Sequence, residues 1–328
     1  IGDQTVGLLR GPISEQKADY CPSYYSLRFK EQDERDLNNP FFDVSFILIP
    51  PPDKDGYCSF GHFMCNKKTY AQHSRRVIAQ VDDRLIRTYG DNFIHISQVD
   101  AFVEENLPYL PWMPPNRNTT TLATSARSVS PEAIAVAHQI KPLLRNGDCI
   151  QIGAGSTAQF LFQLGAFDGL SDLGCHTAAG MAGQTRSVLD GQSNGQLKTV
   201  HGNVAISTTF SIDGDPDEVY KLHMNPKFAL YSQAYVNDIR LIQKHDNMVS
   251  INNAIAVDIT GQVASDGLGH EIWSGAGGQA EFSIGSALSN GGRNITVLPS
   301  TTIDKNGTRV SRIVPVFPTG TPVTVLRA

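Results

Sequence analysis

Residues 148–158 read Asp-Cys-Ile-Gln-Ile-Gly-Ala-Gly-Ser-Thr-Ala, and this stretch indicates the class of fold. Its first five residues form a short, mostly apolar run of the kind found in buried strands. The glycines that follow predict a tight turn, because backbone without a Cβ can bend sharply and approach a neighbour closely. We expect a helix to open after the turn, which makes the stretch one strand–helix unit of an α/β protein.

Similar apolar runs recur along the chain and are separated in places by helical stretches. The expected strands are 44–49, 77–81, 93–96, 148–152, 204–208, 255–259 and 295–298, and helices are expected at 67–76 and 157–164. Strands that alternate with helices predict open, mainly parallel sheets. A further helix should begin at Pro131, because Ser130 is a good N-cap and proline suits the first helical position. It should run to about residue 145, although Pro142 predicts a kink or an early end.

The most irregular stretch, residues 107–130, predicts a linker between two domains. It contains several prolines followed by a run of small polar residues, a composition typical of connecting segments. A chain of 328 residues also has the length of about two domains. We therefore expect one domain over residues 1–118 and a second over 125–328. The many glycines of the C-terminal half suggest backbone packed close to a ligand or to another strand.

The composition excludes several classes of protein. Lys and Arg number 27 and Asp and Glu 32, so the net charge of −5 gives no general attraction to nucleic acid or anionic lipid. No apolar run is long enough for a membrane-spanning helix. The five scattered cysteines include no CxxC pair, which argues against a disulfide framework and a structural zinc site. We expect a reducing, cytoplasmic compartment, with no metal, no nucleic-acid partner and no membrane association.

Two glycine-rich stretches could bind a ligand through backbone N–H groups. Residues 153–158 have the G-x-G-x-x-A spacing of a dinucleotide-binding turn. Such a site needs an acid at the end of the next strand, whereas Asp172 precedes one, so a simple tight turn explains the pattern at least as well. Residues 275–278 hold three glycines in four positions. They could aim N–H groups at an anion or a carbonyl oxygen, or form only a flexible turn.

Two further patterns suggest nucleophiles but lie in the wrong context. Residues 191–195 spell the G-x-S-x-G of a nucleophile elbow, which requires a buried strand before the serine and a helix after it. The polar residues around Ser193 favour an ordinary turn instead. Cys175 beside His176 could suggest a thiol–imidazole pair, but sequence neighbours on a strand point to opposite faces.

Segments spread over nearly the whole chain resemble the acetyl-CoA hydrolase/transferase family, close to 4-hydroxybutyrate and butyryl-CoA:acetate CoA-transferases. The segments that carry this resemblance are 55–61 (DGYCSFG), 77–81 (VIAQV), 87–95 (RTYGDNFIH), 151–155 (QIGAG), 235–238 (YVND), 246–255 (DNMVSINNAI), 258–263 (DITGQV), 274–279 (SGAGGQ), 298–301 (LPST) and 311–315 (SRIVP). The resemblance implies two α/β domains of the CoA-transferase type, with open, mainly parallel sheets and the active site between them. Relative to the family, the chain begins late and ends early.

The resemblance also implies a covalent mechanism. A glutamate attacks the acyl-CoA thioester and forms an acyl-glutamyl anhydride. The CoA thiolate then returns to give a glutamyl-CoA thioester, from which a second carboxylate takes the CoA. A carboxylate suits this role because it can form both an anhydride and a thioester. The implied substrates are an acyl-CoA, with coenzyme A as the group transferred, and a free carboxylate, and the family suggests a homo-oligomer.

At the glutamate position this chain departs from the family pattern. The glutamate normally follows a His-Thr or His-Ser pair, but here Ala178 follows His176 and Thr177. Ala182 stands where an aspartate is usual. A methyl group cannot act as a nucleophile, so Ala178 marks either an engineered inactive form or a natural divergence, and the second loss at Ala182 favours divergence. Glu271 is a distant candidate for a relocated carboxylate.

The resemblance assigns the other site residues. Asn237 corresponds to a family asparagine near the catalytic glutamate, and Gly278 belongs to the loop that supplies N–H donors to the tetrahedral intermediates. A substrate contact is expected at Gln80. Binding of CoA is expected at Gly153, Ala154, Gly155, Gly275, Ala276, Gly277 and Gln279.

Three functions stay open from the sequence. The first is an acyl-CoA:carboxylate CoA-transferase, or a directed inactive form of one. The second is a glutamate-independent acyl-CoA hydrolase or another acyl-CoA-transforming enzyme, which needs only a positioned water and an oxyanion hole. The third is a non-catalytic acyl-CoA-binding homologue.

Overall fold

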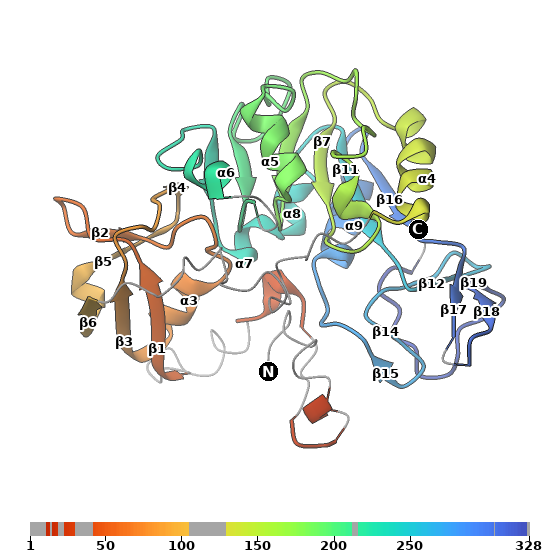
Figure 1. The fold of residues 1–328 in the computed structure, drawn as a ribbon, viewed down its shortest axis with the longest axis horizontal. Coiled ribbons are helices and arrows are strands. Elements are labelled where there is room, and N and C mark those ends of the chain that lie inside the picture. Colours follow the sequence, from red (N-terminus) through yellow and green to blue (C-terminus); the bar gives the residue numbers. More distant parts are fainter. Residues whose placement is uncertain are drawn as a thin grey trace. The chain divides into compact units, whose positions relative to one another are not determined.

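The computed structural model describes residues 11–13, 15–18, 23–29, 42–104, 129–211, 216–304 and 306–326. Almost all of the predicted linker, and both predicted domain boundaries, lie outside these residues. The chain forms two compact units, each assembled from separate segments. Unit 1 comprises residues 1–27, 128–170 and 237–328, and unit 2 comprises residues 28–127 and 171–236. Both units are built from strands and short helices, so the predicted α/β class is confirmed (Figure 1).

Unit 1 is organised around a parallel sheet with the strand order β16-β11-β7. These strands are β7 (Cys149–Ile152), β11 (Met248–Asn253) and β16 (Arg293–Val297). All of β7 and nearly all of β11 are buried, because both faces of a parallel sheet are usually covered. Helix α9 (Gln279–Leu288) packs against β11 and β16. Its last turn leads to Ser289, which bonds to the start of β11, so α9 begins near the carboxyl ends of these strands.

The helix predicted at Pro131 is confirmed as α4 (Pro131–Ile140). The Ser130 side chain accepts a hydrogen bond from the Ala133 N–H at 3.2 Å, as an N-cap should. The helix ends well before residue 145 and continues as a 3-10 turn, η3 (Lys141–Leu143). Pro142 lies in that turn and explains the early end, because it cannot donate a backbone hydrogen bond.

Smaller elements complete the described part of unit 1. They are η1 (Tyr25–Leu27), η4 (Ala158–Phe160), α8 (Ile239–Ile242), β12 (Ala256–Asp258), β13 (Val263–Ala264), β14 (Gly267–Leu268), β15 (Glu271–Ile272), β17 (Thr301–Ile303), β18 (Arg309–Ser311) and β19 (Ile313–Val314). Strand β12 pairs with β13 and β19, β14 pairs with β15, and β17 pairs with β18. Helix α8 packs on α9, and Asn237, two residues before α8, contacts the first turn of α9.

Unit 2 contains two sets of parallel strands. The first has the order β1-β3-β6 and the second the order β8-β9-β10-β4. The strands are β1 (Phe42–Ile49), β3 (Ser74–Val81), β4 (Tyr89–Gly90), β6 (Ala101–Glu104), β8 (Gly174–Thr177), β9 (Ala205–Ser207) and β10 (Phe228–Leu230), with β2 (Tyr57–Ser59) and β5 (Phe93–His95) forming an antiparallel pair. The helices are α3 (Lys67–Gln72), η2 (Ile96–Gln98), α5 (Ala182–Leu189), α6 (Pro216–Tyr220) and α7 (Gln233–Val236).

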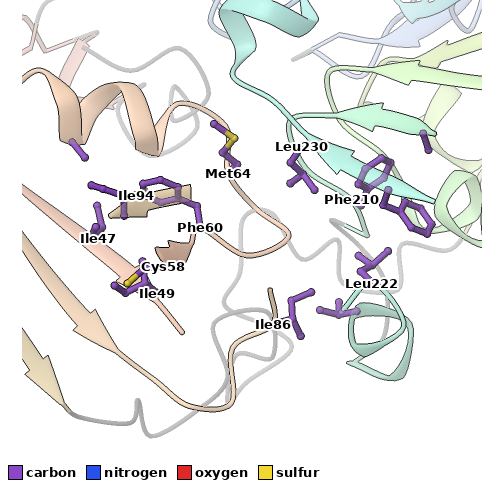
Figure 2. Close-up of a cluster of buried hydrophobic side chains, with 14 of the residues drawn as sticks. Ile47, Ile49, Cys58, Phe60, Met64, Ile86, Ile94, Phe210, Leu222 and Leu230 are labelled. Carbon is purple, nitrogen blue, oxygen red and sulfur yellow. The ribbon is translucent and has the colours of Figure 1, made fainter. Parts of the chain in front are cut away.

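An apolar cluster lies in the interior of the part of unit 2 that the structure describes. Figure 2 shows side chains from β1, β2 and β10 in this cluster together with Met64, Phe60 and Phe210. Met64 and Phe210 are completely buried. Burying a large apolar side chain of this kind contributes about 1.5–3 kcal/mol relative to leaving it exposed. The cluster therefore fixes the strand ends from which the loops of unit 2 emerge.

Two predicted helices are wrong in their extent. The helix expected over 67–76 ends at Gln72, and Ser74 already begins β3, because the β-branched and apolar residues that follow pair with β1. The helix expected over 157–164 is only the single 3-10 turn η4. After it the chain folds back through consecutive turns, with hydrogen bonds from Gly165 N–H to Phe162 O and from Ala166 N–H to Leu161 O. In the first region tertiary pairing overrides local helix propensity, whereas in the second local turn hydrogen bonds replace the helical ones.

None of the helices in the described part of the chain has the length and apolar character needed to span a bilayer.

Candidate active site

The turn after β8 carries Ala178, and the segment after β9 holds it in place. Strands β8 and β9 are parallel neighbours, so both segments emerge from the same edge of the sheet, where ligands bind in open α/β folds. Thr208 Oγ1 donates a hydrogen bond to the Ala178 carbonyl at 2.6 Å. The Gly180 N–H donates to the Thr209 carbonyl at 2.8 Å. Ala178 itself is half-buried and offers only a methyl group at this edge.

The same segment after β9 also receives the chain that leads into α3. The backbone N–H groups of Met64 and Cys65 both donate to the Thr208 carbonyl, at 3.1 and 3.0 Å. The Cys65 Sγ lies 3.8 Å from Thr208 Oγ1. Thr208 therefore ties the turn at Ala178 to the start of α3, so the backbone at position 178 is fixed although its side chain makes no polar contact.

His176 is a structural residue rather than an acid–base catalyst. It is completely buried on β8, and its Nε2 lies 2.8 Å from the carbonyl oxygen of Val236. Since a carbonyl can only accept, Nε2 carries the proton of the neutral ring. Burial lowers the pKa of His176 to about 3, so the ring stays neutral at physiological pH. Cys175 instead packs in the apolar cluster, which confirms that the two side chains do not form a thiol–imidazole pair.

In unit 1, Asn237 and Glu281 form a buried pair at the start of α9. Asn237 is completely buried, and its Nδ2 donates to Glu281 Oε2 at 2.7 Å. The other carboxylate oxygen of Glu281, Oε1, accepts from the Ser26 N–H at 2.8 Å. Burial raises the pKa of Glu281, while these hydrogen bonds act in the opposite direction. Within the described residues, Asn237 Oδ1 is buried without a hydrogen-bond partner.

Gly278 lies directly against this pair. It is the N-cap residue of α9, and a Cβ added to it would fall inside the contact distance of Asn237 Nδ2. A side chain at position 278 would therefore have to displace the amide of Asn237, which is buried in that space. Gln279 follows at the first position of the helix, buried, and its Nε2 has no hydrogen-bond partner among the described residues. The structure thus brings together three of the predicted site residues: Asn237, Gly278 and Gln279.

The remainder of the predicted glycine loop is less constrained. Gly275 is buried, whereas Ala276 and Gly277 are partly exposed. A Cβ at Gly277 would meet no atom within 4 Å. The backbone of this stretch is therefore approachable at Gly277, and a contact with CoA there stays a prediction.

Sequence reasoning missed Glu281. A carboxylate in the first turn of a helix is ordinarily explained by its favourable interaction with the helix dipole, so nothing in the sequence separates it from a solvent-exposed cap residue. The structure shows that it is 2% exposed and bonded to Asn237. Ile284 and Leu288, which share its stripe of the helix at i+3 and i+7, are exposed, so the helical pattern offers no signal that position 281 is buried.

The loop at Gly153–Gly155 is held by the polar residues that end β11. Asn253 Nδ2 donates to the carbonyls of Gly153 and Ala154, at 3.3 and 3.2 Å. The Gly153 N–H donates to the Ile251 carbonyl at 2.8 Å, and the Gly155 N–H donates to Gln159 Oε1 at 3.2 Å. These contacts are enough to explain the glycines as parts of a tightly packed turn, without a ligand. The turn leads into the short 3-10 element η4 rather than the long helix of a dinucleotide site, and binding of CoA to Gly153, Ala154 and Gly155 stays a prediction.

The other candidates lie in three separate places. Gln80 is half-buried near the carboxyl end of β3, in a different set of strands from β8. Ser193 is buried in a turn, with its Oγ 2.7 Å from Ser187 Oγ, so the nucleophile-elbow reading is excluded, as the sequence predicted. Glu271 is exposed on the β14–β15 hairpin. No cluster of three or more potential metal ligands occurs in the part of the chain that the structure describes.

Comparisons with known proteins identify the family. Residues 4–114 match the acetyl-CoA hydrolase/transferase N-terminal domain, and residues 215–328 match the C-terminal domain of the same family. A 4-hydroxybutyrate coenzyme A transferase of Clostridium kluyveri is 35% identical over 98% of this chain and 70% of its own length. The chain belongs to the acetyl-CoA hydrolase/transferase family. It is therefore a member of a family of CoA-transferase enzymes, as the sequence motifs implied.

Two further relatives support the assignment. A butyryl-CoA:acetate CoA-transferase of Anaerostipes caccae is 31% identical over 87% of this chain and 62% of its own length. Among solved structures, RipA from Yersinia pestis shares 30% identity over 96% of this chain and 68% of that chain, with a TM-score of 0.79. The match in three dimensions confirms the fold of the CoA-transferase type that the sequence predicted.

Proposed function

We propose that the protein binds acyl-CoA thioesters as a CoA-transferase-family enzyme in which Ala178 occupies the position of the nucleophilic glutamate. The observation that carries the proposal is the similarity to a CoA-transferase over 98% of the chain. A free carboxylate is the second substrate of that reaction class. On this proposal Ala178 cannot form the acyl-glutamyl anhydride, because a methyl group has no lone pair to attack a thioester.

The geometry supports retention of the ligand-orienting groups. The Asn237 amide, the Gly278 loop and the first turn of α9 form one packed cluster. The first N–H groups of an α-helix have no acceptor within the helix, and together with an asparagine amide they suit the developing negative charge of a thioester carbonyl. The cluster therefore has the donors that an acyl-CoA reaction requires, whether the acceptor is a carboxylate or water.

Isothermal titration calorimetry with CoA and acetyl-CoA tests this proposal. We expect saturable binding of both, with NAD as a control ligand that gives no heat. Binding of NAD without a response to either CoA species would overturn the proposal and favour the dinucleotide interpretation of residues 153–158.

The second candidate function is glutamate-independent hydrolysis of an acyl-CoA, and Ala178 is the observation that favours it. Removing a carboxylate side chain from a half-buried position leaves room where a water can stand. Release of free thiol from acetyl-CoA, followed with a thiol reagent in the absence of any carboxylate, separates the two functions. Steady thiol release identifies a hydrolase, and ligand binding without thiol release identifies a binding protein. The homo-oligomer and the domains 1–118 and 125–328 stay predictions beside both functions.

A further inference from the structure

We propose that Glu281 is a positioning residue that turns the NH₂ end of the Asn237 amide toward the Gly278 loop, where it donates to the thioester carbonyl of a bound acyl-CoA. This inference rests on the proposed function. It concerns a residue outside the sequence motifs that carry the family resemblance. Within unit 1, Asn237 bonds to Glu281, Glu281 bonds to Ser26, and the Asn237 amide lies against Gly278.

Asn237 and Glu281 differ in the hydrogen bonds that their side chains can form. An ionised carboxylate only accepts hydrogen bonds, whereas an asparagine side chain has a donor end and an acceptor end. Glu281 Oε2 receives its bond from Asn237 Nδ2 at 2.7 Å. Because Glu281 can only accept, the reversed orientation of the amide would place two oxygens against each other. Glu281 therefore selects one of the two amide orientations.

Glu281 is itself anchored by a second hydrogen bond. Its Oε1 accepts from the Ser26 backbone N–H at 2.8 Å, and the side chain is 2% exposed. A carboxylate with one oxygen bound on each side cannot rotate without losing a buried hydrogen bond. The main chain at Ser26 thus fixes the carboxylate, and the carboxylate fixes the amide.

The selected NH₂ group lies beside Gly278. Nδ2 lies within contact distance of the position that a Cβ of residue 278 would take, so the donor end of the amide borders the glycine loop at the start of α9. An NH₂ group has two hydrogens, and Glu281 uses one of them. In the part of the chain that the structure describes, Nδ2 donates to Glu281 alone, so its second hydrogen is left for a ligand beside the loop, whose own backbone N–H groups suit a carbonyl oxygen.

Substitution of Glu281 by glutamine makes a specific prediction, because Ser26 controls the outcome. The Ser26 N–H needs an acceptor, so the glutamine oxygen should face Ser26 and its NH₂ should face Asn237. The Asn237 amide then turns over to offer Oδ1, and its NH₂ leaves the Gly278 loop. Both hydrogen bonds and the side-chain volume are kept, so Glu281→Gln should fold with a melting temperature close to that of the parent protein.

The test compares binding of acetyl-CoA, which has a thioester carbonyl, with binding of CoA, which has none. Both affinities are measured by calorimetry on the purified protein and on Glu281→Gln. We expect acetyl-CoA to bind about tenfold more weakly to the variant, the scale of one lost hydrogen bond, and CoA to change by less than about twofold. Glu281→Asp, which keeps an acceptor-only group, should recover part of the acetyl-CoA affinity.

Two controls separate positioning from general damage. Glu218→Gln alters another buried carboxylate, which accepts from Ser211 Oγ at 2.6 Å in unit 2, and should leave both affinities unchanged. The second control is a double-mutant cycle. Since Glu281 acts through Asn237, Glu281→Gln combined with Asn237→Ala should bind acetyl-CoA no more weakly than Asn237→Ala alone.

The possible failures are distinguishable. Equal losses of CoA and acetyl-CoA affinity, unchanged affinity for both, or additive losses in the double variant would each overturn the positioning role. Equal affinity of the unsubstituted protein for CoA and acetyl-CoA would also overturn it, because the carbonyl would then receive no donor. If the unsubstituted protein binds neither ligand, the proposed function itself fails.

Discussion

The turn after β8 and the first turn of α9 differ in the polar side chains that they carry. At the turn, Ala178 offers a methyl group on a backbone that Thr208 holds in place. At the helix, Asn237 and Glu281 remain buried and bonded to each other. An exchange to alanine at a half-buried turn leaves no polar group unsatisfied, whereas losing either member of a buried pair strands the other at a cost of about 1–3 kcal/mol. On the proposed function, the site can therefore lose its reacting group more readily than the groups proposed to orient the ligand.

The largest effect should follow from Ala178→Glu. If the turn lacks only its nucleophile, the added carboxylate should raise the rate of CoA exchange between acetyl-CoA and labelled acetate at least about a thousandfold, because covalent catalysis again becomes possible. Ala179→Glu is the matched control, since it adds the same side chain one residue further along the turn. Comparable gains in both variants would show that position 178 has no special place.

The next effect tests the helix side of the comparison. Gly278→Ala adds a Cβ that collides with Asn237 Nδ2, so it should displace the amide and weaken acetyl-CoA binding at least about tenfold. Gly277→Ala adds the same atom to open space, and its loss should be at least about fivefold smaller. Calorimetric affinities for the two variants measure the difference. Similar losses would mean that the loop is sensitive to any side chain and that the contact with Asn237 is incidental.

The two units should also respond to pH in opposite directions. In unit 2, burial lowers the pKa of His62 and of His176 to about 3. Unfolding returns the pKa of both rings to 6.5. The free energy of unfolding is therefore unaffected by these histidines well above pH 6.5 and decreases as the pH falls below it. Linkage gives a loss of about 2 kcal/mol for each histidine at pH 5, or about thirtyfold in the unfolding equilibrium.

In unit 1, burial raises the pKa of Asp266 to about 6, and the Thr324 hydroxyl that donates to it only partly offsets this. Its contribution is therefore greatest below pH 4 and is lost as the pH rises through 6, by about 3 kcal/mol in all. Hydrogen exchange corrected for intrinsic rates should show β8 and β9 losing protection at pH 5 while the segment around Asp266 gains it. Asp266→Asn should remove the response of that segment, and the same pH trend in both units would contradict this assignment.

The smallest effect is expected at the excluded serine. Ser193→Ala removes a hydroxyl that is buried against Ser187, so it should change acetyl-CoA binding or turnover less than about twofold while lowering stability by about 1 kcal/mol. Thiol release and thermal unfolding measure the two quantities. Loss of turnover in this variant would restore the nucleophile-elbow interpretation.

The parts of the fold that could be predicted from the sequence are those in which local pattern and tertiary packing agree. The apolar run of β7 and the capped start of α4 are such cases, because burial and capping act on neighbouring residues. The helix expected over 67–76 ends early because the residues from Ser74 onward pair with β1 as strand β3. In the site, Gly278 and Asn237 were found through the family motifs. Glu281 was not, because its role depends on Ser26, which lies 255 residues away in the chain.

The measurement that tests the central claim most directly is mass spectrometry of the protein and of Ala178→Glu after incubation with acetyl-CoA, followed by peptide mapping. The account predicts a covalent glutamyl-CoA adduct on residue 178 of the variant and no adduct on the unsubstituted protein. Robust turnover by the unsubstituted protein with no gain from the added carboxylate, or a covalent adduct on another of its side chains, would contradict the claim that Ala178 marks the vacant nucleophile position.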